Sequence, residues 1–258
     1  MQRVNDPHSQ FEMYNNLKDG DLVETGEKPI VADVDQYDSF FKACSSVVEL
    51  QKKSPHLSFD NITAHLNKLV SQDLGISENT NHHIEVISAR LGLLRYSTVK
   101  DKDLARLEML KKTVQESLGT EPVKPVKLST LVDKGVALCT ECAILAQAYL
   151  QKQGIESYIC KAKLFQDTAS GITAEDHHFL AINDSGRMFV YDPLNYTETG
   201  RPRIMNTGLS KEEFIKRADG NETFIIDFKP ELEKRKSVFD IGDPHHLGYG
   251  IFRRKTKE

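Results

Sequence analysis

The chain of 258 residues is long enough to form one large domain or two small ones and to bury a substantial hydrophobic core. Its formal charge of −4 at pH 7 lacks the basic excess of a general nucleic-acid binder, so no nucleic-acid partner is expected. No apolar run approaches the roughly 20 residues that a membrane-spanning helix needs, so no membrane association is expected either.

Residues 1–35 are polar and rich in charge, glycine and proline, which predicts a loose N-terminal arm. The first 16 residues lack the apolar segment of a secretory signal, so the default expectation is a cytoplasmic protein. A protein exported by a specialised secretion system would look the same, because such signals need no hydrophobic segment.

Residues 36–120 carry a helical period. Phe40, Phe41, Cys44 and Val48 recur at spacings of three and four, which predicts a first helix. Three further segments, at 59–75, 81–96 and 103–119, show the same period, and Gly75 marks the end of the first of them. Two prolines in "TEPVKPVKL" then end the helical region.

Residues 121–230 have a different character. A helix is expected at about 139–153, and strand-like runs follow at 157–165, 177–182, 188–192 and 223–228. A short helix begins at the capping box formed by Ser210 and Glu213. The predicted fold is α+β, with a helical N-terminal half packed on a small antiparallel sheet, and residues 231–258 form a C-terminal extension.

Four cysteines, Cys44, Cys139, Cys142 and Cys160, are too few for a disulfide scaffold in a chain of this length, so we expect reduced thiols. Cys139 and Cys142 form a C-x-x-C pair that several kinds of site could use. A zinc site would need further ligands, from Cys160 or from the histidine doublets at 82/83, 177/178 and 245/246. A redox pair at a helix N-terminus is the second reading, and two small core residues are the third.

The two cysteines of the pair have different expected environments. Cys142 shares a helix face with Leu145, Ala146 and Tyr149, so it is expected in the core. Cys139 lies in the first turn, where unpaired N–H groups and the helix dipole favour a thiolate and can stabilise an oxyanion. Cys139 is therefore the candidate nucleophile.

A nucleophilic thiol needs a base, and the base needs an orienting carboxylate. The segment "EDHHFLAINDSGRMFVYDP", residues 175–193, reads as two strands joined by a turn, and it offers His177, His178 and Asp192. The plainer interpretation of the doublet is one structural histidine and one exposed histidine.

The register of this hairpin distinguishes the two histidines. A two-residue turn at Ser185-Gly186 sets Ala181 opposite Val190 and Phe179 opposite Asp192. His177 then lies on the face of Asp192, within side-chain reach, and His178 points to the other face with Leu180 and Ile182. A three-residue loop would reverse the choice.

These residues resemble the transglutaminase-like superfamily, whose members have a papain-like fold. In that family a nucleophilic Cys precedes an apolar helix that ends in Gly-Ile, as Cys139 precedes Gly154-Ile155 here. "HHFLAINDSGRMFVYDP" is similar to the family's His strand, glycine-containing turn and strand ending in Asp-Pro. The resemblance covers about residues 128–195. It departs from the family pattern at three positions: Phe179 stands in place of Trp, His178 in place of a small residue, and Gly135 lies four residues before Cys139 rather than two.

The resemblance implies a catalytic triad of Cys139, His177 and Asp192. No cofactor-binding residue and no metal ligand is predicted. Its expected chemistry is acyl transfer on a protein or peptide substrate through a thioester, ending in deamidation, transamidation or proteolysis. Bacterial effectors occur in this superfamily, and a host protein would then be the partner. The same fold also serves as a non-enzymatic binding module, with the helical half as the recognition surface.

Two further features have plain interpretations beside the catalytic one. Glu141 is close enough to Cys139 to take part in the chemistry, but a carboxylate is also favourable at any helix N-terminus. The doublet His245-His246 is expected in a surface loop rather than at a metal.

Overall fold

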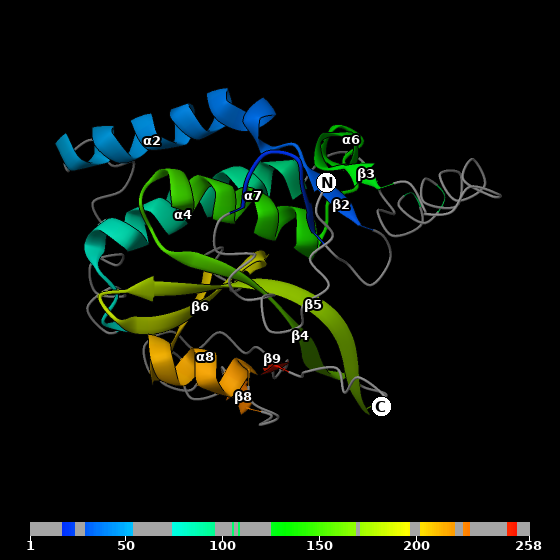
Figure 1. Cartoon of the computed structure of the whole chain (residues 1–258), viewed down its shortest axis with the longest axis vertical. Coiled ribbons are helices and arrows are strands. Elements are labelled where there is room, and N and C mark those ends of the chain that lie inside the picture. Colours follow the sequence, from blue (N-terminus) through cyan, green and yellow to red (C-terminus); the bar gives the residue numbers. More distant parts are fainter. Residues whose placement is uncertain are drawn as a thin grey trace.

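The structure is a computed structural model, which describes residues 17–23, 29–53, 74–95, 105, 108, 125–168, 171–196, 202–219, 224–227 and 247–251. It has an α+β fold in which helices pack on an antiparallel sheet (Figure 1). The helices are η1 (Val34–Tyr37), α2 (Asp38–Lys53), α4 (Glu78–Arg95), α6 (Leu128–Asp133), α7 (Cys139–Lys152) and α8 (Lys211–Asp219). Among these described residues, no helix has both the length and the apolar character needed to cross a membrane.

The larger sheet has the strand order β7-β6-β5-β4-β9-β8, and all its neighbours are antiparallel. Its strands are β4 (Ser157–Thr168), β5 (Gly171–Asp184), β6 (Arg187–Tyr196), β7 (Pro202–Ser210), β8 (Phe224–Asp227) and β9 (Leu247–Ile251). The sheet is larger than the sequence predicted. β9 adds to it from the expected C-terminal extension by pairing with β4 and β8.

A second, three-stranded sheet joins β1 (Asp21–Val23), β2 (Ile30–Ala32) and β3 (Val126–Lys127). β2 pairs antiparallel with β1 and parallel with β3. Val23, Ile30 and Ala32 are buried in the hydrophobic core. The expectation of a loose arm over 1–35 is therefore wrong for these two strands, because their apolar side chains are buried and their backbones are paired.

Helix α2 confirms the first predicted helix, which contains Phe40 and Val48, and α4 confirms the helix predicted at 81–96. Helix α8 confirms the short helix predicted at the capping box of Ser210 and Glu213. In the last of these, the Ser210 N–H donates to the Glu213 carboxylate at 3.0 Å, and the Glu213 N–H donates to the Ser210 hydroxyl at 3.2 Å. Most of the segments 59–75 and 103–119 lies outside the described residues, as does the His245-His246 doublet.

Helices lie on both sides of the larger sheet: α2, α4 and α7 are on one side and α8 is on the other (Figure 1). The alternation of side chains along the strands agrees with this arrangement. Leu180, Ile182 and Tyr191 belong to the core cluster shared with the helices, whereas Phe179 and Val190 are buried outside that cluster. The two faces of β5 therefore meet different layers of the molecule.

Asp184 fastens the helical layer to the end of β5. Its carboxylate accepts hydrogen bonds from the Ser77 N–H at 2.7 Å, the Ser77 hydroxyl at 2.7 Å and the Thr80 hydroxyl at 2.8 Å. Ser77 also caps α4, because its hydroxyl accepts from the Thr80 N–H. One carboxylate therefore sets the position of α4 relative to the β5–β6 hairpin.

Candidate active site

Helix α7 brings Cys139 to the sheet. Leu138 is extended and precedes the helix, and the Leu138 N–H donates to the Glu141 carboxylate at 2.7 Å. Glu141 is fully buried, so this bond holds the start of the helix in one geometry. The interpretation of Glu141 as a carboxylate that stabilises the helix N-terminus thus has a direct structural basis.

The C-terminal end of α7 is capped by backbone hydrogen bonds. Gly154 has a φ of +73°, a left-handed conformation that glycine adopts without a steric penalty. Its N–H donates to the carbonyl of Gln151, and the N–H of Ile155 donates to that of Leu150, the two bonds of a Schellman motif. Both ends of the helix are fixed, so Cys139 sits on a rigid support.

The two cysteines of the pair differ as expected. Cys142 is buried, together with Leu145 and Tyr149 on the inward face of α7. Cys139 is partly exposed at the first position of the helix. The four cysteines all have free thiols.

The β5–β6 hairpin has the register that the two-residue turn predicts. Asp184 pairs with Arg187, and Ala181 pairs with Val190. Ser185 and Gly186 have φ values of +55° and +83°, as a type I′ turn requires. The last pair in the described register is Leu180 with Tyr191, so the ladder ends one pair before Phe179 and Asp192.

Beyond that last pair, His177 and Asp192 meet. The distance between His177 Nε2 and Asp192 Oδ2 is 2.8 Å, and both side chains are buried. The second carboxylate oxygen of Asp192 accepts from the Leu194 N–H at 2.9 Å. The carboxylate is thus held at both oxygens and can fix the orientation of the imidazole.

Cys139 completes this group. Its thiol hydrogen-bonds with His177 and with His178. Because Nε2 of His177 is used by Asp192, Nδ1 is the nitrogen left for the sulfur. The structure therefore brings all three predicted residues together, in the order thiol, imidazole, carboxylate.

The electrostatics of the group favour an ion pair. Burial alone would raise the pKa of the Cys139 thiol, but hydrogen bonds and charge interactions with the two histidines lower the pKa to about 6. Burial alone would lower the pKa of His177, but the charge and hydrogen bond of Asp192, with Cys139, raise the pKa to about 10. Between these values the stable form is a thiolate beside an imidazolium.

The pKa values of Cys44 and Cys160 shift in the opposite direction. Burial raises the pKa of Cys44 to about 11 and that of Cys160 to about 12. A thiolate is the reactive form of cysteine, so neither thiol has the character of a nucleophile at neutral pH.

His178 is the site residue that the sequence argument undervalued. It lies on the face of β5 that meets the helices, as the register predicts, but it is neither exposed nor remote from the site. Its Nδ1 lies 3.0 Å from the hydroxyl of Thr140, the residue after Cys139. The interpretation of the doublet as one structural and one exposed histidine is therefore wrong. Only Cys139 and Cys142 of the C-x-x-C motif were candidates in the sequence, but the partner of His178 is Thr140, which lies between them.

The C-x-x-C pair was also a candidate for a zinc site. No group of three or more His, Cys, Asp or Glu side chains within the described ranges could hold a metal ion.

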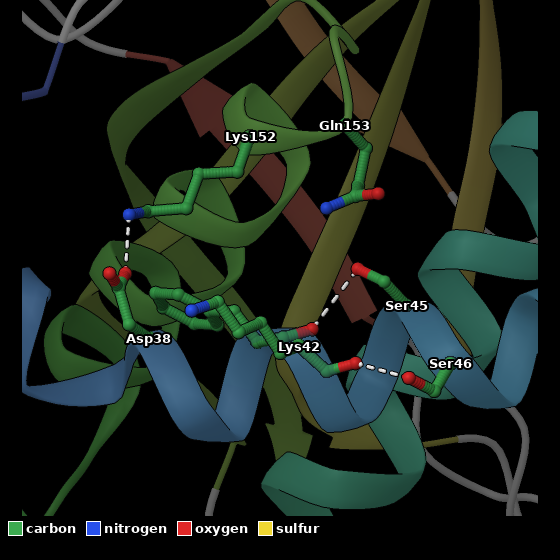
Figure 2. A pocket seen from close by; sticks show the side chains of 7 residues that line it. Asp38, Lys42, Ser45, Ser46, Lys152 and Gln153 are labelled. Atoms are coloured by element: carbon green, nitrogen blue, oxygen red, sulfur yellow. Dashed lines mark hydrogen bonds and ion pairs between the residues drawn. The ribbon is translucent and has the colours of Figure 1, made fainter.

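A groove of about 530 Å³ lies where α2 meets the C-terminal end of α7 (Figure 2). There Lys152 Nζ lies 2.6 Å from Asp38 and 5.8 Å from the centre of the Phe41 ring. Because α7 has 14 residues, this groove lies roughly 20 Å from Cys139 and is separate from the candidate site.

The chain matches no protein-family model, no curated protein and no solved structure. The assignment of function therefore depends on the residues of the site and on their geometry.

Proposed function

We propose that the protein is a thiol acyltransferase or hydrolase that acts on carboxamide groups of protein or peptide substrates, by deamidation or transamidation. The observation that carries the proposal is the contact of the partly exposed Cys139 with the buried pair His177 and Asp192, in which Nε2 of His177 lies 2.8 Å from the Asp192 carboxylate. The finer assignment of the fold to the transglutaminase-like class is part of the same proposal. The position of Cys139 at the start of a helix packed on an antiparallel sheet supports it.

The first half-reaction forms a thioester. The Cys139 thiolate attacks the carbonyl carbon of the carboxamide, and a tetrahedral oxyanion forms. The Cys139 N–H precedes the first intrahelical bond, which runs from the Cys142 N–H to the Leu138 carbonyl at 3.0 Å. It can therefore donate to the oxyanion. His177 gives its proton to the departing nitrogen, the C–N bond breaks, and ammonia leaves.

The second half-reaction releases the product. His177, now neutral, accepts a proton from water or from an amine as that nucleophile attacks the thioester. The C–S bond breaks, and the thiolate and imidazolium are restored. Water yields a carboxylate, which is deamidation, and an amine yields a new amide bond, which is transamidation. Asp192 keeps His177 in one orientation through both steps.

Intact-mass analysis of candidate substrate proteins tests this proposal. A gain of about 1 Da indicates deamidation, a loss of about 17 Da indicates cross-linking, and fragments indicate proteolysis by the same thioester route. Cys139→Ala should abolish the mass change, whereas Cys142→Ala should keep it because Cys142 is a core residue. Mass changes that persist in Cys139→Ala, or that vanish only in Cys142→Ala, would contradict the proposal. Partner capture that is unaltered in Cys139→Ala, with no mass change in any candidate, would indicate a binding module instead.

A further inference from the structure

The contact between Thr140 and His178 adds a second buried histidine to the candidate site. Thr140 and His178 are only 4% and 5% exposed, so their hydrogen bond is shielded from water. Thr140 follows Cys139 directly on α7, and His178 follows His177 directly on β5. The pair therefore connects the helix that carries the thiol to the strand that carries its base.

The position of the sulfur explains how neighbouring residues of one strand can both reach it. Consecutive side chains of a strand point to opposite faces. The described β5–β6 register runs from Asp184 and Arg187 to Leu180 and Tyr191, so His177 and His178 lie beyond its last pair. At this end of the hairpin both histidines hydrogen-bond with Cys139, which follows Leu138 at the start of α7.

We propose that His178 is a positioning residue that donates its Nε2–H to the Cys139 sulfur while the Thr140 hydroxyl donates to its Nδ1. The inference rests on the proposed function and deepens it, because it identifies a second group that keeps the nucleophile as a thiolate. In this arrangement Thr140 fixes the tautomer of His178, as Asp192 fixes the orientation of His177. His177 supplies the proton for the leaving group, and His178 supplies a further hydrogen bond to the sulfur.

A hydrogen bond to a charged group contributes enough free energy to move a protonation equilibrium measurably. The titratable groups around the sulfur are His177 and His178 on β5, Asp192 on β6 through His177, and Glu141 on α7 itself. Glu141 is engaged with the Leu138 N–H. Removal of the His178 donor should therefore act on the thiol while His177 and Asp192 remain in place.

The test is the rate of iodoacetamide alkylation of Cys139 as a function of pH, which needs no substrate. The wild-type midpoint is expected at about pH 6. His178→Leu should raise this midpoint by about one unit, so that alkylation at about pH 6 slows roughly fivefold and alkylation above about pH 9 is unchanged. Thr140→Val, which keeps the shape of the side chain but removes the hydroxyl, should shift the midpoint in the same direction by less.

Conservative replacements and a matched control sharpen the test. His178→Gln, whose amide can donate to sulfur, and Thr140→Ser, which restores the hydroxyl, should bring the midpoint back toward that of the wild type. Tyr149→Phe removes the hydroxyl from the other buried histidine–hydroxyl pair, in which His83 Nδ1 lies 2.8 Å from Tyr149 Oη. That variant should leave the midpoint where it is, because neither group contacts Cys139.

Nitrogen NMR shifts of His178 in the wild-type protein provide a second measurement that needs no variant to fold. They should show a protonated Nε2 and an unprotonated Nδ1. A protonated Nδ1, or alkylation midpoints in Thr140→Val and His178→Leu equal to that of the wild type, would overturn the inference. A slower rate that is the same at every pH would overturn it too, since lost packing rather than a lost donor would explain it. A missing mass change in every substrate would contradict the proposed acyl transfer and leave this result standing.

Discussion

Cys139 differs from an ordinary cysteine through its neighbours rather than through burial. Burial disfavours a thiolate and raises the pKa of Cys160, which lacks a histidine partner. At Cys139 the same effect is outweighed by His177 and His178. His177 depends in turn on Asp192, whose charge outweighs the effect of burial on the imidazolium. The reactivity proposed for one sulfur thus originates in a carboxylate that does not touch it.

Catalysis should follow a bell-shaped pH profile. Acyl transfer needs Cys139 deprotonated and His177 protonated, so kcat/KM should rise with pH through about 6 and fall as pH increases through about 10. The rising limb reports the thiol, whose pKa is lowered, and the falling limb reports the imidazole, whose pKa is raised. Initial rates measured across this range would show it. A single rising limb near 9, the ordinary thiol value, would contradict the ion pair.

Asp192→Asn should separate the carboxylate's charge from its shape. The amide occupies nearly the same space but removes the charge that raises the pKa of His177, so the falling limb of the profile should move to lower pH. The rate should drop roughly 10²- to 10⁴-fold, because the amide can also stabilise the wrong tautomer of the imidazole. Arg187→Lys on the same strand, an exposed position remote from the thiol, is the control and should behave as the wild type. Equal profiles for Asp192→Asn and the control would contradict the role of Asp192.

At the scale of the elements, the hairpin turn determines which histidine lies beside Asp192. A type I′ turn needs left-handed residues at both central positions, and Ser185 and Gly186 supply them. The turn can be identified in the sequence because glycine favours this conformation, and the alternation of strand side chains then places His177 on the face of Asp192. This part of the site was predictable because it depends on neighbours in the chain.

Gly186→Ala should destabilise the hairpin through the backbone alone. Gly186 has a φ of +83°, and no atom lies within 4 Å of the position of an added Cβ. The cost is therefore conformational, about 1–2 kcal/mol in the free energy of unfolding. Urea denaturation would measure it. Ser185→Gly, which relieves the left-handed conformation of a non-glycine residue, should not destabilise the protein. A Gly186→Ala variant as stable as the wild type would mean that the turn adopts another type.

The other parts of the site could not be read from the sequence. The contact between Thr140 and His178 joins residues 38 positions apart, and it depends on where α7 crosses the edge of β5. The contacts of Cys139 with two neighbouring histidines also depend on tertiary packing. Periodicity predicts which face a side chain occupies, but it does not predict which element lies against that face.

At the scale of the whole molecule, long-range pairing holds the layers together. β2 pairs with β3 through two residue pairs, Ile30 with Val126 and Val31 with Lys127, and β9 pairs with β4 through four. Strands of two to five residues are too short to show a period of two, so the sequence did not predict β1, β2, β3 or β9. The nine-residue strand β7 was not predicted either, whereas α2, α4, α7 and the strands β4, β5, β6 and β8 were, because each of these carries several apolar residues.

Asp184→Ala should destabilise the whole molecule without altering the thiol. The carboxylate accepts three hydrogen bonds from Ser77 and Thr80, and its loss leaves these donors without their acceptor where α4 meets the hairpin. The free energy of unfolding should fall by about 3 kcal/mol, measured by urea denaturation. Glu212→Ala, an exposed carboxylate on α8, is the control and should change stability by less than about 0.5 kcal/mol. Equal effects of the two substitutions would contradict the tether between the layers.

The most direct measurement of the central claim is the ultraviolet absorbance of the Cys139 thiolate, taken as the difference between the wild type and Cys139→Ala during a pH titration. The ion pair with His177 predicts a transition at about pH 6, which His177→Ala moves toward the ordinary thiol value of 9. A wild-type transition near 9 that His177→Ala leaves in place would show that the thiol and the imidazole do not act together.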